Sequence, residues 1–514
     1  TNRSVDTAAN RTTGAITFLS GAQAYTISNN TITLGGDLTN NSAATQRVSS
    51  GLTLNWDRSI NAASGDLALA NLDLGTQNRV NTATFNAAAN RTITLSGNLT
   101  DANDKALPVG NIVKTGAGTL LVTGSLQHHG TTTIEQGVLA AAGTIGDLTQ
   151  TAIIPTLVFA GGTLQATGNI TTSAEANRQA IILQETGIFD TNGHTITLDS
   201  GITGPGGITK TGTGTLVFTA NALPTTLPQS LKGEGYYQGN LTITAGLAQL
   251  ALGANLGPNT SVFISGNGAL ELSQANGTLT NTITLNGMGD PSLRGALFFK
   301  NAGTPTFSGA IQVLGNSTIA AIASTPTFTG NVSTENNAIL YTNVLDGGTL
   351  TLQGNATGTG GLGTSSTHIG TLSLGNATNT YNGSTLLNSG TLLVQTASNL
   401  PSGPGGHMVI GNNATLKLTV SSATETFDWT RNLQLSGSGY GPSSGAIFNS
   451  ACANKFSGYT SLYGNTTLFI KGGSLEFAGP VNIGSHTLQI TTPTGLGYIP
   501  ATISGNLSGN GTIL

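Results

Sequence analysis

The glycine-punctuated stretch Gly204–Gly246, GPGGITKTGTGTLVFTANALPTTLPQSLKGEGYYQGNLTITAG, contains the pattern that the rest of the chain repeats. It holds three short runs of threonine with branched or aromatic apolar residues: Ile208–Thr211, Thr215–Thr219 and Leu241–Thr244. Glycines bound each run. Runs of this kind between glycines are typical of β-strands and turns, and not of helices. The stretch therefore predicts three strands joined by turns.

This pattern recurs before and after the stretch. Lys114–Leu120 (KTGAGTL) matches Lys210–Leu216 (KTGTGTL), and the tripeptide that begins at Tyr381 matches the one that begins at Tyr237. Recurrence at a fixed spacing indicates a solenoid or another repeat array. In all three copies two glycines lie seven residues apart, at Gly130 and Gly137, Gly239 and Gly246, and Gly383 and Gly390.

The repeated glycines are expected to lie in turns. Glycine adopts positive φ without steric penalty and leaves room where a Cβ is poorly tolerated, so we expect several of them to have positive φ. The glycines to which this prediction applies are Gly116, Gly118, Gly212, Gly214, Gly239, Gly246, Gly383 and Gly390.

The composition favours a thin, repetitive core. The 514 residues include 73 glycines, 7% charged residues and 5% aromatic residues. The chain is too apolar and too regular for a disordered linker. It is also too poor in large apolar residues for several thick globular cores. A solenoid needs only a thin interior in each coil and fits this composition.

Charge and cysteine content exclude several classes of protein. The net charge of −4 is spread over 17 basic and 21 acidic residues without a run of either sign. This is not the electrostatic footprint of a protein that binds nucleic acid or an anionic membrane surface. A single cysteine, Cys452, cannot form an internal disulfide. No apolar run approaches the roughly 18 residues of a membrane-spanning helix. Because the chain starts at Thr1 without a signal peptide, we expect a processed, exported protein.

The predicted fold is all-β: a right-handed parallel β-helix (solenoid) that forms one elongated rod. Strands of a sandwich alternate strictly and are joined by hairpin turns. Here one to four small residues separate the strands, and similar strands return at coil-sized intervals. With roughly 25 residues per coil, the chain would make about 20 coils. We expect one continuous domain, with divergent coils over residues 1–53 and repeat-bearing halves over 54–257 and 258–514. Residues 101–109 and 220–235 are the segments expected to form loops.

Three segments resemble the autotransporter-associated β-strand repeat of exported proteins from Gram-negative bacteria. They are Ile112–Val122 (IVKTGAGTLLV), Ile208–Phe218 (ITKTGTGTLVF) and Tyr381–Val394 (YNGSTLLNSGTLLV). The third copy has Gly370-Thr371-Leu372 before it but lacks Lys-Thr-Gly. The resemblance implies a right-handed parallel β-helix that is secreted or displayed on the cell surface. Proteins with this repeat are mostly autotransporter passengers, adhesins and other large surface proteins.

Strings that match catalytic motifs lack the structural context that those motifs need. Gly358–Gly363 satisfies the dinucleotide-binding fingerprint, but no helix is expected after it. Gly441–Gly445 satisfies the nucleophile-elbow string without a strand-to-helix turn. We expect no catalytic, cofactor-binding or metal-binding residues.

The remaining polar and aromatic candidates are expected to be structural. On a strand, His128 and His129 would point to opposite faces and could not bind one metal ion together. We expect them instead to be surface residues of a turn. The acidic pairs are expected to be solvated turn residues, with weak calcium binding as the alternative. One aromatic residue of each pair is expected to cap the core, with carbohydrate binding as the alternative. The residues concerned are Asp101 with Asp104, Glu425 with Asp428, Trp56 with Trp429, and Tyr236 with Tyr237.

The end of the sequence suggests self-association. Ile503–Leu514 repeats the phrase that precedes Lys-Thr-Gly elsewhere, so the sequence stops within a repeat. Thr512, Ile513 and Leu514 would form an apolar strand without a polar cap, and solenoids usually need caps to stay soluble. We expect end-to-end contacts between copies through these residues. A fragment of a longer passenger is the alternative.

Three classes of function remain open. The first, which we expect, is a non-enzymatic extracellular structural protein that assembles end to end into a surface filament or layer. The second is an autotransporter passenger that acts as an adhesin, with surface glycans or neighbouring cells as partners. The third is a polysaccharide-active β-helix enzyme.

Overall fold

The computed structural model consists almost entirely of β-strands. It describes residues 3–75, 80–101, 110–147, 155–174, 177–219, 237–254, 256–257, 259–273, 276–291, 295–375, 378–401, 404–419, 427–441, 444–493 and 501–514. The chain divides into two compact units, Thr1–Thr260 (unit 1) and Ser261–Leu514 (unit 2). Parallel strands stack into a β-solenoid of about 19 turns. Within the residues described, the helical structure is limited to the 3-10 turn η2 (Ala397–Asn399).

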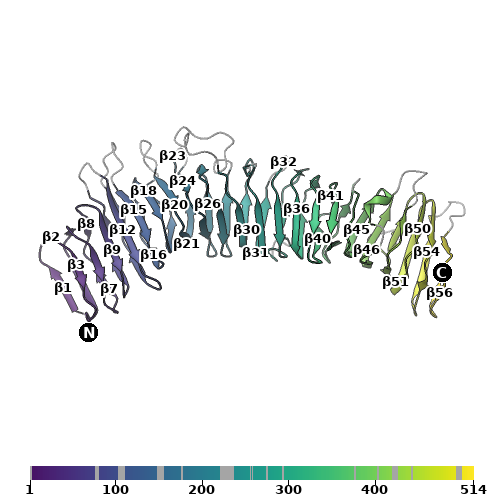
Figure 1. Ribbon diagram of the computed structural model, residues 1–514, viewed down its shortest axis with the longest axis horizontal. Helices are drawn as coiled ribbons and strands as arrows, with labels where there is room; N and C mark the ends of the chain where they lie inside the picture. The colour runs from purple at the N-terminus through teal and green to yellow at the C-terminus, as the bar shows by residue number, and fades with distance from the viewer. Residues whose placement is uncertain are drawn as a thin grey trace. The chain divides into compact units, whose positions relative to one another are not determined.

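Unit 1 contains three stacks of strands, in which paired strands belong to successive coils (Figure 1). In the first stack, β25 and β26 belong to one coil and β28 and β29 to the next. The first stack is β1 (Arg3–Thr7), β4 (Tyr25–Asn29), β7 (Gln46–Val48), β10 (Leu67–Leu69), β13 (Thr92–Leu95), β16 (Thr119–Val122), β19 (Val138–Gly143), β21 (Thr163–Thr171), β25 (Gly187–Asp190), β26 (Thr195–Leu198), β28 (Ile208–Thr211), β29 (Thr215–Phe218) and β30 (Leu241–Leu250). The second is β2 (Arg11–Thr13), β5 (Ile32–Leu34), β8 (Leu52–Leu54), β11 (Leu72–Asp73), β14 (Leu99–Thr100) and β17 (Leu126–Gln127). The third is β3 (Ile16–Phe18), β6 (Leu38–Asn40), β9 (Arg58–Ala62), β12 (Asn81–Ala87), β15 (Gly110–Thr115), β18 (Thr131–Ile134), β20 (Thr156–Phe159), β24 (Ala180–Leu183) and β27 (Ile202–Thr203). A short antiparallel pair, β22 (Ser173–Ala174) and β23 (Asn177–Arg178), projects from this arrangement.

Unit 2 repeats the same parallel stacking. Its largest sheet comprises β31 (Val262–Leu272), β32 (Thr278–Leu279), β33 (Ile283–Asn286), β34 (Leu297–Phe299), β35 (Thr306–Phe307), β36 (Ile311–Gly315), β37 (Ser317–Ala321), β38 (Thr327–Phe328), β39 (Val332–Thr334), β40 (Ile339–Val344), β41 (Thr349–Leu352), β42 (Ala356–Gly358), β43 (Gly361–Thr364), β44 (Thr371–Ser373), β45 (Thr385–Val394), β46 (Met408–Leu418), β48 (Leu433–Gly437), β49 (Ile447–Asn449), β51 (Thr460–Ile470), β53 (Val481–Asn482), β54 (Thr487–Thr491), β56 (Leu507–Ser508) and β57 (Thr512–Ile513). A smaller stack comprises β47 (Asp428–Trp429), β50 (Ala453–Phe456), β52 (Ser474–Phe477) and β55 (Ala501–Ile503).

The core of unit 1 is a set of in-register ladders. Alternate residues of each strand point inward, so one side chain per coil enters each ladder. One ladder runs through Leu67, Ile93, Leu120, Leu139 and Leu164, which are each at most 1% exposed. Burial of a leucine or isoleucine side chain contributes about 1.5–3 kcal/mol, so each coil gains stability from the coils on both sides.

The core of unit 2 follows the same rule with aromatic side chains. Phe427, Phe456 and Phe477 are buried on successive coils, with ring centroids 5.8 and 5.3 Å apart. Such ring pairs contribute stability beyond the area that they bury.

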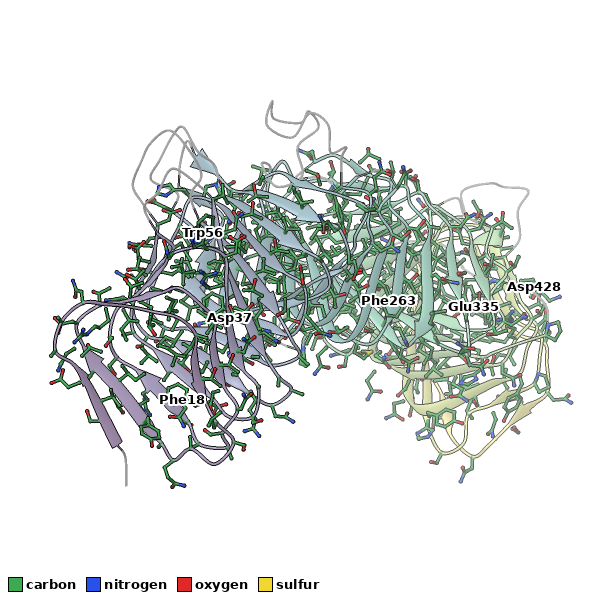
Figure 2. All side chains as sticks on the ribbon, turned by 60° about the vertical axis from the view of Figure 1, so that its left-hand side comes forward. Phe18, Asp37, Trp56, Phe263, Glu335 and Asp428 are labelled. Atoms are coloured by element: carbon green, nitrogen blue, oxygen red, sulfur yellow. The ribbon has the colours of Figure 1, made fainter. Side chains whose placement is uncertain are left out.

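Polar side chains connect successive coils at the outer edge. Asp37 Oδ1 accepts a hydrogen bond from the backbone N–H of Ser59 at 2.9 Å (Figure 2). Asp57 Oδ1 accepts from the N–H of Thr82 at 2.8 Å. Each bond satisfies an amide that lies just outside the strand ladder, which extends the pairing between coils by one residue.

The parallel β-helix predicted from the sequence is confirmed. Of the three strands predicted in Gly204–Gly246, the first is β28, the second is one residue longer than β29, and the third continues to Leu250 in β30. The expected loop over residues 220–235 lies outside the described residues, and of the expected loop over 101–109 only Asp101 is described.

Candidate functional site

The lysine of each Lys-Thr-Gly motif, Lys114 or Lys210, is buried inside unit 1. Lys210 Nζ donates hydrogen bonds to the carbonyl oxygens of Thr211 (2.8 Å), Gly212 (2.7 Å) and Ala245 (2.9 Å). An ammonium group has three donors, and here all three are used. Lys114 makes the equivalent set, to Thr115 O (2.6 Å), Gly116 O (2.7 Å) and Gln136 O (3.0 Å).

These two lysines fasten turns to the next coil. Both side chains are fully buried, and burial lowers the pKa of each to about 8. The charge of Asp190 acts in the opposite direction on the pKa of Lys210. At neutral pH both ammonium groups therefore remain charged, and hydrogen bonds to a charged donor are the stronger kind.

Thr364 occupies the lysine position in the third copy. It pairs in register with Leu387, as Lys114 pairs with Ile134 and Lys210 with Ile243. Its Oγ1 donates to Ser389 O at 2.7 Å, the carbonyl just before Gly390. The hydroxyl thus satisfies the same carbonyl of the next coil, although Lys-Thr-Gly is absent. This role was not predicted from the sequence. The alternation of β15 places Lys114 on the same inward face as Ile112, and this alternation could have indicated that the lysine is buried.

The repeated glycines have two kinds of geometry. Four have positive φ, at Gly116 (70°), Gly212 (74°), Gly246 (66°) and Gly390 (75°). At the other four a Cβ would approach a backbone oxygen or carbon of the preceding coil: Gly118 (2.2 Å), Gly214 (1.9 Å), Gly239 (2.0 Å) and Gly383 (2.3 Å).

A cluster of three titratable side chains, two of them buried, lies at one corner of unit 1. Asp101, His129 and Asp147 follow the paired positions Leu99, Leu126 and Ile145 on three successive coils. The N–H of His129 donates to Asp101 Oδ2 at 2.9 Å, and its Nδ1 lies 2.6 Å from Asp101 Oδ1. Its Nε2 lies 3.4 Å from Asp147 Oδ2. One imidazole therefore bridges two carboxylates from different coils.

The prediction that His128, His129 and Asp101 are surface residues is wrong. His128 is completely buried and His129 is 6% exposed, because the corners of neighbouring coils pack against them. His128 Nε2 lies 2.8 Å from Thr132 Oγ1. Asp101 is 9% exposed, and burial raises its pKa, although hydrogen bonds and the charge of His129 act against that rise. Within the described part of the chain, no three His, Cys, Asp or Glu side chains are placed to hold a metal ion.

We expect the protein to lose stability in acid, because two histidines are buried in the folded state. Burial lowers the pKa of His128 from 6.5 to about 3 and that of His368 from 6.5 to about 4. Below pH 6.5 the unfolded chain binds protons at these sites and the folded chain does not. The free energy of unfolding therefore falls as the pH drops from about 6.5 towards 4, by about 3 kcal/mol per histidine.

Urea unfolding from pH 4 to 8 measures this effect. His368 Nδ1 accepts a hydrogen bond from the N–H of Val344 at 3.0 Å, and an asparagine Oδ1 can take its place. We expect His368→Asn to flatten the acid side of the profile, and His486→Asn, at a half-buried position, serves as the control. Because Asp101 is present in every variant, its opposite contribution cancels in the comparison. Identical slopes in the parent and in His368→Asn would contradict this prediction.

The other sequence candidates lie apart from one another. Gly358–Gly363 belongs to β42 and β43 and not to a strand-to-helix turn. Asp428 is exposed in β47. Trp429 is 1% exposed, whereas Trp56 is 49% exposed on the outside of unit 1 (Figure 2). Tyr237 is 5% exposed and donates its hydroxyl to Asn240 O at 2.8 Å. Asp104, Tyr236, Glu425 and Ser443 lie outside the described residues.

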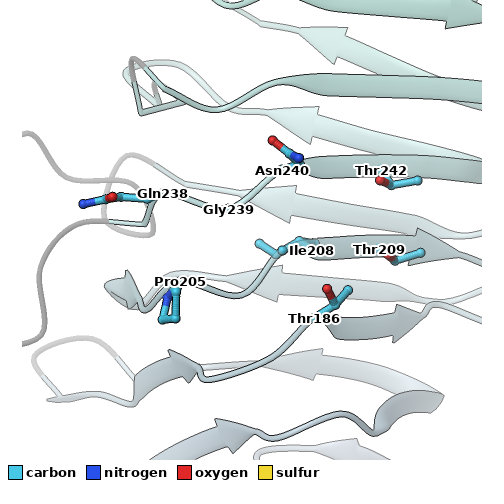
Figure 3. Close-up of a pocket in the computed structure, with 9 residues that line it drawn as sticks. Thr186, Pro205, Ile208, Thr209, Gln238, Gly239, Asn240 and Thr242 are labelled. Carbon is cyan, nitrogen blue, oxygen red and sulfur yellow. The ribbon is translucent and has the colours of Figure 1, made fainter.

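A polar groove of about 330 Å³ lies on the outer face of unit 1 (Figure 3). It crosses the starts of β28 and β30, next to Tyr237, where the described chain resumes. Its lining residues are all uncharged: Thr186, Pro205, Gly207, Ile208, Thr209, Gln238, Gly239, Asn240 and Thr242.

The residues Thr512, Ile513 and Leu514 lie on the outermost described coil of unit 2. Thr512 and Ile513 pair with Thr487 and Leu488 of β54. Leu514 exchanges backbone hydrogen bonds with Leu488 and Ile490, both at 2.9 Å. Ile513 is 41% exposed and Leu514 68% exposed. The strand is therefore paired on one side and exposes apolar side chains.

No protein-family model, curated protein or solved structure matches this chain. Within the described residues, no helix is long and apolar enough to cross a membrane.

Proposed function

We propose that this chain is a non-enzymatic structural protein of a bacterial surface, a β-solenoid subunit that stacks end to end with other copies. The observation that carries the proposal is the self-complementary edge of each coil. Leu488 pairs with Thr466 on one side and with Ile513 on the other. Because successive coils pair in the same register, the backbone edge of one coil can pair with the backbone edge of another.

Stacking would pair the backbone of a strand in one copy with that of a strand in another, as β57 pairs with β54 within unit 2. Leu507 (50% exposed), Ile513 (41%) and Leu514 (68%) are apolar side chains that such a contact would cover. A contact between two different edges is heterologous, and it propagates into a filament unless it closes into a ring.

The Lys-Thr-Gly segments support an exported, extracellular location in a Gram-negative bacterium, because they resemble the autotransporter-associated repeat. The buried corner supports a structural role over a catalytic one. Asp101, His129 and Asp147 interact with one another across three coils, which ties those coils together.

The self-association of the purified chain tests this proposal. We expect Ile513→Glu to weaken association by about tenfold or more, because a carboxylate at the stacked edge would be buried without a partner. Tyr463→Glu is the matched control, since Tyr463 is 67% exposed on β51, away from that edge. Sedimentation velocity and electron microscopy over a range of concentrations give the readout. A parent that stays monomeric throughout, or equal effects of the two variants, would overturn the proposal.

A further inference from the structure

The groove of Figure 3 is built from two outward-facing rungs of three successive coils. Gly187 pairs with Ile208, and Ile208 pairs with Leu241. The positions immediately before these form the first rung: Thr186, Gly207 and Asn240. The positions immediately after them form the second: Ile188, Thr209 and Thr242.

Gly207 opens the groove by leaving a gap in the first rung. A Cβ at this position would lie 3.0 Å from Asn240 O and 3.4 Å from Thr186 Oγ1. Its φ lies outside the left-handed region, so the backbone conformation does not require glycine here. The preceding Gly206 is different, because a Cβ there would lie 2.0 Å from Glu185 O. Close packing excludes a side chain at Gly206. At Gly207 a Cβ would be tight against Asn240 O, and the absence of a side chain leaves room between Thr186 and Asn240.

The floor of the groove is held by buried residues. Tyr237 is buried, and its hydroxyl donates to Asn240 O, which also accepts the N–H of Ile208 at 2.8 Å. The rung that carries Asn240 is thereby fixed to the coil before it. A preorganised polar surface loses little conformational entropy when a ligand binds.

The chemistry of the lining selects an uncharged, hydroxyl-rich ligand. The threonine hydroxyls and the side-chain amide of Gln238 offer both donors and acceptors. None of the lining residues supplies a counter-charge, so an ionic ligand would lose hydration without compensation. Strands of successive coils lie about 4.8 Å apart, close to the advance of one sugar in an extended chain of β-linked pyranoses. Thr209 and Thr242 can therefore meet successive sugars. We propose that this groove binds an extended, neutral glycan.

Titration calorimetry with neutral and acidic oligosaccharides tests the proposal. Cellohexaose, mannohexaose and xylohexaose are the neutral probes, and hexagalacturonate is the acidic one. We expect at least one neutral probe to bind and hexagalacturonate to bind more weakly. The double variant Thr209→Val/Thr242→Val keeps the β-branched shape and removes two hydroxyls, and it should weaken binding by about tenfold or more. Thr94→Val, on an outward position of β13, is the matched control and should bind as the parent does.

Hydrogen exchange of the parent keeps the test independent of the folding of the variants. A bound neutral probe should slow amide exchange in residues 186–188, 207–209 and 240–242 more than elsewhere. The proposal is overturned if no neutral probe binds at millimolar concentration, if hexagalacturonate binds more tightly, or if protection falls outside these segments.

Discussion

Replacement of Lys210 by methionine is expected to destabilise unit 1 by about 3 kcal/mol. Methionine preserves most of the volume of the lysine side chain but cannot donate hydrogen bonds. The carbonyl oxygens of Thr211, Gly212 and Ala245 would each lose their bond to Nζ in a buried place. Such acceptors are expensive to bury without a donor.

Local hydrogen exchange is the appropriate measurement, because coils of a solenoid can open without global unfolding. We expect faster exchange of the amides around residues 211–216 and 245–250 in Lys210→Met. Lys471→Met, at an exposed position, serves as the control. Equal protection in Lys210→Met and in the parent would show that the three hydrogen bonds contribute nothing to the stability of this turn.

Replacement of Gly214 by alanine is expected to cost about 3 kcal/mol or more, the upper range for one substitution. The new Cβ would lie 1.9 Å from His194 O, the atom that accepts the N–H of Thr215 at 3.0 Å. The substitution therefore forces apart two coils at a paired position. Backbone atoms cannot move aside as a flexible side chain can.

Gly193 in the same turn region provides a matched comparison. It has a φ of 84°, but the nearest atom to a Cβ there is Thr213 Oγ1 at 3.9 Å. Gly193→Ala introduces only backbone strain, which we expect to cost about 1 kcal/mol. Thermal and urea unfolding of both variants measures the difference. If Gly193→Ala proves as damaging as Gly214→Ala, close approach of the coils is not what requires glycine at position 214.

The fold could be predicted because strand and turn signals are local. β28 and β29 were visible as threonine-rich runs between glycines, and the recurrence of KTG implied stacked coils. Strand ends were less certain. β30 continues past Gly246 to Leu250, because pairing with β28 and then with β29 holds both halves of the strand in one sheet.

The role of Lys114 and Lys210 was not predicted, because their partners come from elsewhere in the chain. From the sequence alone, burial of a lysine would be expected to destabilise the fold, because the three carbonyl oxygens that accept its hydrogen bonds are not known. The burial of His128 and His129 was missed for a related reason. The alternation of apolar and polar residues shows which way a side chain points within a strand. At a corner between strands, the packing of the neighbouring coils determines whether a side chain is buried.

The groove was equally hidden in the sequence. Thr186, Gly207 and Asn240 are ordinary residues that become neighbours only through the register of β25, β28 and β30. Tyr237 is buried, as expected for the aromatic residue that caps the core, and its hydroxyl donates to Asn240 O under the groove.

The side chain that fastens each turn to the next coil tolerates different lengths of chain between itself and the carbonyl that it bonds. Lys114 reaches a carbonyl 22 residues later, Thr364 one 25 residues later, and Lys210 one 35 residues later. Closing the longest of these loops instead of the shortest costs well under about 1 kcal/mol of chain entropy. Insertions between the fastening side chain and the carbonyl that it bonds therefore change the free energy of unfolding very little. New surface segments can accumulate there over evolution, while the coils beneath them stay the same.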